Sequence, residues 1–100
     1  MDGVTITHEA TETGGLYTAQ VSGEQHKGTL EWEPKTDAQG DVRVATHTIV
    51  PPAIGGRGIA GQLVKQLIAD ARDQGFRIVP QCSYVAKKFD NNPDWADLRA

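Results

Sequence analysis

The chain has 100 residues, of which 38% are hydrophobic, with 10 Lys and Arg against 13 Asp and Glu. This length supports one modest hydrophobic core, so residues 1–100 are expected to form a single domain. The single cysteine, Cys82, excludes an intramolecular disulfide and a zinc site built from several cysteines. There is no secretory signal and no apolar run long enough for a membrane span, which predicts a cytoplasmic protein.

Charge and glycine are unevenly distributed along the chain. Residues 1–50 carry eight acidic and three basic side chains, a net −5, whereas residues 51–100 carry five acidic and seven basic ones, a net +2. Four of the eleven glycines lie between Gly55 and Gly61. A mildly acidic protein is unsuited to general nucleic-acid binding, but the basic half suits one small anionic ligand. Taken alone, the charge difference is equally well explained by chance.

The first half of the chain has the pattern of short strands separated by turn residues. Between the second and third of them lies Ser22-Gly23, and the polar segment from Pro34 to Asp41 is predicted to be a loop. Short connections between successive strands favour an antiparallel meander. The predicted strands are Val4–Thr7, Leu16–Val21, His26–Trp32 and Val42–Val50.

The second half changes to a helical period. Apolar residues recur every three to four positions from Ile59 to Ala71, and Gly75 stands where a left-handed C-cap belongs. The segment Phe76–Pro80 is then a buried strand. A right-handed strand–helix–strand crossover predicts that this fifth strand lies parallel to the fourth.

A second short helix is expected at Tyr84–Phe89, with Trp95 and Leu98 docking the tail. The predicted fold class is therefore α/β, more closely described as α+β. Its sheet is mostly antiparallel with four or five strands, the first long helix is the central crossover, and the second helix is short and C-terminal.

The glycine-rich segment between the fourth strand and the first helix suits a phosphate or pyrophosphate. Glycines allow close approach of the backbone, and the helix N-terminus contributes unpaired N–H groups and partial positive charge. The stretch Gly56–Gly61 matches the dinucleotide pattern G-x-G-x-x-G, but that interpretation is rejected because Gln81 and Cys82, not an acid, follow the next strand. No Gly-Lys-Ser/Thr follows either, which excludes a nucleoside-triphosphate loop. The alternative is a loose connection without a ligand.

The segment from Val50 to Ala60 resembles the acetyl-CoA signature of the GNAT superfamily of N-acetyltransferases, Arg/Gln-x-x-Gly-x-Gly/Ala. Gly55 occupies the Arg/Gln position, and Arg57 lies two residues later, from where it would reach a phosphate. Together with this segment, three others resemble the small single-domain GNAT-like acetyltransferases, over about residue 16 to the C-terminus. They are His47-Thr48, Pro80–Val85 and Asn92–Leu98.

The resemblance implies a binding site for acetyl-CoA or coenzyme A. The backbone of Ile49 and Val50 would pair with the pantetheine arm like an added strand, and the loop N–H groups would bind the pyrophosphate. Lys87 and Lys88 would approach the adenosine 3′-phosphate, with a solvated helix face as the alternative. The expected coenzyme-binding residues are Ile49, Val50, Gly55, Gly56, Arg57, Gly58, Ile59, Ala60, Gly61, Lys87 and Lys88.

Acetyl transfer to an amine needs a neutral amine, stabilisation of an oxyanion and a proton for the leaving thiolate. A strand N–H near Val50 would polarise the thioester carbonyl. The superfamily often uses a Tyr on the last helix as general acid, but Phe89 stands at the matching position. The resemblance places Cys82 beside the sulfur end of the coenzyme, as acid or as transient acetyl acceptor. The alternative is a small buried hydrophobe.

His47 is the second catalytic candidate, as the base that removes the amine proton; the alternative is a half-buried histidine that ties its strand to a neighbour. Glu31 and Glu33 share a strand face and would attract a cationic amine, or are simply solvated. His8 and His26 have no partner visible in the sequence, and no spacing supports a metal site.

We therefore expect an enzyme that transfers an acetyl group from acetyl-CoA to a primary amine on a small molecule, peptide or protein. The alternative is a catalytically inactive module that binds coenzyme A or acyl-CoA, and a third alternative is a protein-interaction domain. Gly55 and Phe89 favour the inactive module, whereas Cys82 and His47 favour the enzyme. No metal, nucleic acid or membrane partner is expected. The acceptor is not identified by the sequence, nor is the oligomeric state, although a monomer fits.

Overall fold

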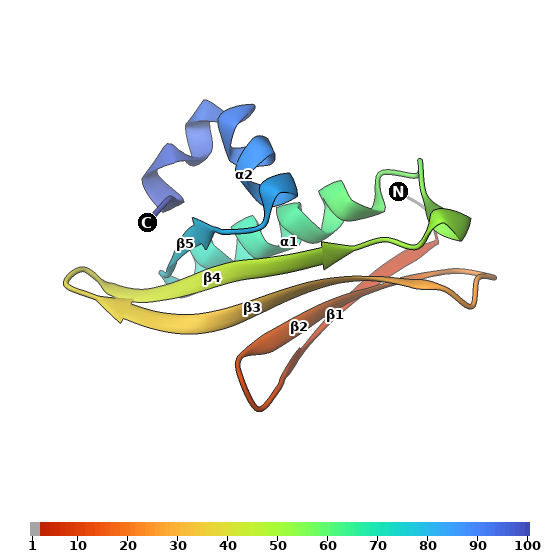
Figure 1. Ribbon diagram of the computed structural model, residues 1–100, viewed down its shortest axis with the longest axis horizontal. Helices are drawn as coiled ribbons and strands as arrows, with labels where there is room; N and C mark the ends of the chain where they lie inside the picture. Colours follow the sequence, from red (N-terminus) through yellow and green to blue (C-terminus); the bar gives the residue numbers. More distant parts are fainter. Residues whose placement is uncertain (1–2) are drawn as a thin grey trace.

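A computed structural model describes residues 3–100. It contains a five-stranded sheet in the order β1-β2-β3-β4-β5, with antiparallel pairing except between β4 and β5, which are parallel (Figure 1). The strands are β1 Val4–Ala10, β2 Gly15–Val21, β3 Lys27–Asp37, β4 Gly40–Ile49 and β5 Arg77–Pro80. The helices are α1 Ile59–Gln74, α2 Ser83–Asp90 and the short 3₁₀ segments Pro52–Ile54 and Pro93–Leu98. This arrangement confirms the predicted α+β class and the parallel fifth strand.

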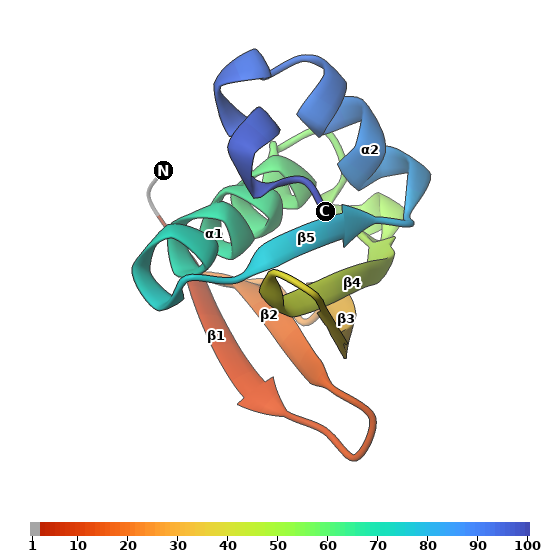
Figure 2. The ribbon, with the colours of Figure 1, turned by 90° about the vertical axis from the view of Figure 1, so that its left-hand side faces the viewer.

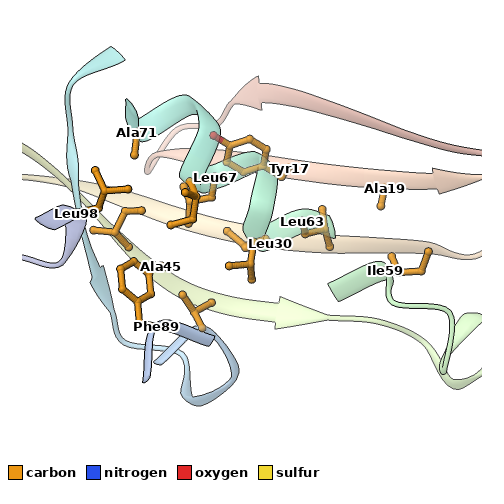
Figure 3. Close-up of a cluster of buried hydrophobic side chains, with 14 of the residues drawn as sticks. Tyr17, Ala19, Leu30, Ala45, Ile59, Leu63, Leu67, Ala71, Phe89 and Leu98 are labelled. Carbon is orange, nitrogen blue, oxygen red and sulfur yellow. The ribbon is translucent and has the colours of Figure 1, made fainter. Parts of the chain in front are cut away.

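The core lies between one face of the sheet and α1. Tyr17 and Leu30 are cross-strand partners on that face, both fully buried, and Leu63 and Leu67 of α1 pack onto the same cluster (Figure 3). Both helices lie on the same side of the sheet in two views at right angles (Figures 1 and 2). Because strand side chains alternate between faces, the residues between these core positions point to the side that no helix of residues 3–100 covers.

The predicted loop between the third and fourth strands is wrong. Its first part, to Asp37, belongs to β3, and β4 begins at Gly40, so the two strands form a long hairpin with a tight turn. The backbone of Pro34 to Asp37 pairs with Asp41 to Arg43 and Gly40, which satisfies polar groups that a loop would leave to water. The Asp37 carboxylate forms an ion pair with Arg77 of β5, and this ion pair links the end of the hairpin to β5.

The pairing of β4 with β5 is short, and it leaves part of the edge of β4 open. It runs from Val42 with Arg77 to Ala45 with Pro80, whereas β4 continues to Ile49. The chain then leaves the sheet, and the Cys82 N–H donates to the Ala45 carbonyl at 2.9 Å. Beyond Ala45, the edge of β4 therefore has no strand beside it within residues 3–100.

A β-bulge lies at the same level of β4. Glu31 pairs with His47 but the next residue of β3 pairs with Ala45, so Thr46 is the extra residue. The Thr46 hydroxyl donates to the Glu31 carbonyl at 3.3 Å, and only 8% of this residue is exposed. Bulges increase local twist and redirect side chains, and this one coincides with the point where β4 and β5 separate.

The second helix and the tail close the end of the core. Phe89 of α2 packs edge-on against Trp95, with 5.7 Å between ring centroids, and Leu98 is buried in the same cluster. The terminal Ala100 N–H donates to the carbonyl of Ile78 in β5 at 2.8 Å. The expected docking of the tail is confirmed. None of the helices among residues 3–100 combines the length and the apolar character that a membrane crossing requires.

Candidate functional site

The loop that leads into α1 exposes its backbone. Gly56 and Gly58 have φ of +75° and +72°, in the left-handed region that favours glycine. Gly55, Gly56, Arg57 and Gly58 are all exposed, and a Cβ on Gly56 would meet no atom within 4 Å. The loop is therefore held open by conformation, with little side-chain cover over its N–H groups.

Gly58 is the N-cap of α1 and offers no side chain to cap it. The first intrahelical bond runs from the Gln62 N–H to the Gly58 carbonyl at 3.1 Å. The N–H groups of Ile59, Ala60 and Gly61 thus have no partner inside the helix, and no acidic residue lies in the first turn. Together with the helix dipole, these groups form a place for an anion.

Side chains of α2 approach this first turn. A Cβ on Gly61 would lie 3.7 Å from the Tyr84 hydroxyl and 3.8 Å from the Lys88 ammonium. Lys88 also lies 5.5 Å from the centroid of the Tyr84 ring, and both line a cavity of about 240 Å³ with Lys87 and Asn91. The Lys88 ammonium therefore adds positive charge beside the free N–H groups. Tyr84 was missed in the sequence analysis, although its spacing of four residues from Lys88 places the two on one helix face.

Arg57 lies in the loop, but its guanidinium is 3.7 Å from the Glu24 carboxylate in the turn between β2 and β3. Both side chains are partly exposed. An ion pair of this kind contributes about 0–1 kcal/mol, so Arg57 is free to exchange its partner for an anion in the loop. The contact between Arg57 and a phosphate that the sequence suggested stays a prediction.

The end of β4 combines an open edge with an exposed apolar side chain. Ile49 is 57% exposed, which is unusual for a large hydrophobic residue, while Val50 is half-buried. An unpaired strand edge accepts an extended ligand that carries amide groups, in the manner of an added strand. The exposed Ile49 side chain supplies apolar surface beside that edge.

Cys82 meets β4 at this edge. Its Sγ lies 3.6 Å from the Thr48 hydroxyl, and Cys82 is the N-cap of α2. Burial raises the pKa of the Cys82 thiol, but hydrogen bonds from the Val85 and Tyr84 N–H groups and from Thr48 outweigh burial, so the pKa is below its ordinary value. The sequence places Cys82 near a helix N-terminus correctly, whereas its contact with Thr48 is a tertiary feature.

His47 is exposed rather than half-buried, so the alternative drawn from the sequence is wrong. It is the cross-strand partner of Glu31, and both line a cavity of about 410 Å³ together with Thr46 and Gln81. Gln81, which precedes Cys82, lines this cavity, but His47 pairs with Glu31 whereas Thr48 pairs with the buried Leu30. The His47 side chain and the contact of Cys82 with Thr48 therefore lie on opposite faces of β4. No three His, Cys, Asp or Glu side chains within residues 3–100 gather so as to hold a metal ion.

Two other residues are structural. Phe89 is 4% exposed and belongs to the core, so the position that matched the superfamily's Tyr packs against Trp95. His8 does have partners: the Trp32 Nε1–H donates to its Nε2 at 3.0 Å, and its ring stacks on Tyr17. Burial first, then the nearby Arg43, lowers the pKa of His8. These contacts join residues far apart in the chain and left no signal in the sequence.

A protein-family model described as GCN5-related N-acetyl-transferase matches residues 16–98. The match covers most of the chain, which therefore belongs to the GCN5-related N-acetyltransferase family. The mostly antiparallel sheet with its crossover helix is consistent with this family. Membership supports acetyltransferase activity in general.

Proposed function

We propose that the protein transfers the acetyl group of acetyl-CoA to a primary amine. One observation carries the proposal: the open edge of β4 leads from the Cys82 thiol at Thr48 to the exposed loop at the start of α1. The order of these features matches the order of parts in an acyl thioester of coenzyme A. The anion site corresponds to the pyrophosphate, the strand edge to the pantetheine arm and the Cys82 thiol to the thioester end.

The coenzyme would be held mostly by backbone. The free N–H groups at the start of α1, together with Lys88 and an Arg57 released from Glu24, support binding of the pyrophosphate. The edge beyond Ala45 supports pairing with the amides of the pantetheine arm. Lys87, exposed on α2, is left for the adenosine 3′-phosphate.

The proposed chemistry uses a strand N–H near Val50, the Cys82 thiol and the His47 side chain. The neutral amine attacks the thioester carbonyl, a C–N bond forms, and a strand N–H near Val50 stabilises the oxyanion. The C–S bond then breaks, the leaving thiolate takes a proton, and the new amide nitrogen gives one up. His47 is the proposed base for the amine proton, and Cys82 the proposed donor to the thiolate. A transient acetyl-Cys82 is the other role for this thiol.

A coenzyme-binding module without catalysis is the second candidate. Its specific support is Gly55 at the Arg/Gln position of the signature and the burial of Phe89 where the superfamily often has a Tyr. Such a module would keep the loop and the edge of β4 but would have no use for an exposed His47.

Two measurements separate these candidates. Calorimetric titration with coenzyme A and acetyl-CoA is expected to give saturable binding, and absence of binding below millimolar concentration would refute both. Thiol release from acetyl-CoA is then followed with a panel of amines, peptides and proteins. Release that depends on the acceptor supports the enzyme, whereas binding without release on any acceptor supports the module.

Variants assign the residues. Cys82→Ala and Cys82→Ser are compared with the native chain in the same assay, and His47→Gln is compared across pH. We expect His47→Gln to lower kcat/KM, because the side-chain amide of glutamine does not accept the amine proton. Turnover that survives both Cys82 substitutions would remove this thiol from the mechanism.

A further inference from the structure

The cavity that contains His47 lies on the sheet face away from α1. Cross-strand register places Leu16, Glu31 and His47 in one row, each opposite the next. Tyr17 and Leu30, the neighbours of the first two in the chain, are buried under α1, so this row points the other way. The face carries no helix among residues 3–100 (Figure 2). The cavity on it is therefore reached without crossing the core.

The cavity has a volume of about 410 Å³. This lies at the lower end of the range usual for small-molecule sites. Its charged lining residues are Glu31 and Glu33, with no Lys or Arg among the lining side chains. Both carboxylates are exposed residues of β3 that share a face, since they are two positions apart. The cavity thus concentrates negative charge at its wall and favours a cation.

The spacing of Glu31 and Glu33 along β3 sets the distance between the two carboxylates. Glu31 faces His47 across the strands, and Glu33 lies two residues further along β3, about 7 Å away for an extended strand. An amine that reacts beside His47 would therefore place Glu33 about 7 Å behind it. Two nitrogens joined by about four methylene groups are separated by about 6 Å when the chain is extended.

We propose that this cavity is the acceptor site and that it selects small linear diamines or polyamines, with Glu33 as the residue that recognises the second positive charge. This inference rests on the proposed acetyl transfer. The reacting nitrogen lies beside Glu31 and His47 and meets the thioester at the open edge of β4, where Gln81 lines the cavity and the neighbouring Cys82 contacts Thr48 from the other face. The second ammonium pairs with Glu33 and remains protonated throughout.

The test uses three probes of similar length: 1,4-diaminobutane, n-butylamine and 4-amino-1-butanol. Binding is measured first without acetyl-CoA, by amide chemical shifts, and kcat/KM is then measured by thiol release. We expect the diamine to bind about fivefold more tightly than either monocation, as for one added ion pair near a surface, and to show a similar advantage in kcat/KM. The advantage should shrink as salt is raised.

Glu33→Gln is the test variant, and Asp73→Asn, on the exposed side of α1, is a control with the same change in net charge. Glu33→Gln should bring the ratio of diamine to butylamine close to one, while Asp73→Asn leaves the ratio as it is. Equal binding of the three probes by the native chain would overturn the proposal, as would an equal effect of the two substitutions.

Two further outcomes distinguish this inference from the proposed function. If the diamine binds with the expected dependence on Glu33 but no acceptor releases thiol, the transferase fails and the cation-selective cavity stands. If lysine peptides are acetylated while the diamine neither binds nor reacts, the transferase stands and the small-diamine site is refuted.

Discussion

Replacing Gly58 by alanine tests the loop at the start of α1 most directly, because the same helix supplies its own control. Gly58 is the N-cap of α1 with φ of +72° and ψ of 18°, and Gly75 is the C-cap with φ of +80° and ψ of 32°. Both glycines therefore have left-handed backbone, and alanine is strained to a similar extent at either position. Only Gly58 lies in the proposed anion site.

The two substitutions should cost similar stability and very different affinity. A left-handed alanine costs about 1–2 kcal/mol, which lowers the melting temperature of a domain of this size by roughly 4–16 °C. If Gly58→Ala moves the loop so that one charge-assisted hydrogen bond to the pyrophosphate is lost, binding weakens by about 1.5–3 kcal/mol. That corresponds to roughly 10- to 150-fold in the dissociation constant for coenzyme A.

Urea denaturation gives the two stabilities, and calorimetric titration with coenzyme A gives the affinities, well below both melting temperatures. Gly75→Ala should bind like the native chain, and Gly58→Ala should bind much more weakly. If Gly58→Ala loses stability but keeps full affinity, the loop does not hold the pyrophosphate. If Gly75→Ala loses as much affinity, the effect is global and the reasoning about the loop is wrong.

Three further predictions concern the thiol and the core. Thr48→Val should raise the pKa of Cys82 by removing a hydrogen bond that favours the thiolate, and the pH dependence of alkylation by iodoacetamide measures this; an unchanged pKa would show that the 3.6 Å contact does not act on the thiol. Leu63→Ala, at a fully buried position, should lower the free energy of unfolding by about 2–5 kcal/mol in urea, and a smaller loss would mean that the core collapses around the site. Tyr17→Phe removes the bond of 2.6 Å to Asp70 and should cost about 1–3 kcal/mol near neutral pH. Burial and Asp70 raise the pKa of Tyr17 in the folded protein, so its contribution to stability is complete below the unfolded pKa of about 10 and falls above it. Between pH 8 and 11 the free energy of unfolding should therefore fall less steeply with pH in Tyr17→Phe than in the native chain. An unaltered slope would contradict the raised pKa of Tyr17.

Local patterns in the sequence determined most of the framework. The three-to-four-residue apolar period and Gly75 predicted the helix that the structure has at Ile59–Gln74, because an amphipathic helix is specified by neighbours along its own turns. The crossover rule predicted the parallel fifth strand. The polar segment after Pro34 was predicted wrongly, since its strand is stabilised by pairing with β4 and by Arg77, and neither is a local property.

The candidate site divides in the same way. The glycine loop and the helix start are contiguous in the chain, so the sequence by itself located the segment for which anion binding is proposed. The contact of Cys82 with Thr48, 34 residues away, exists only in the tertiary structure. The same holds for the cavity that His47 and Glu31 line together. The bulge at Thr46 and the early end of the β4–β5 pairing decide these contacts. Both depend on strand register, which is set by packing across the whole sheet rather than by any short segment.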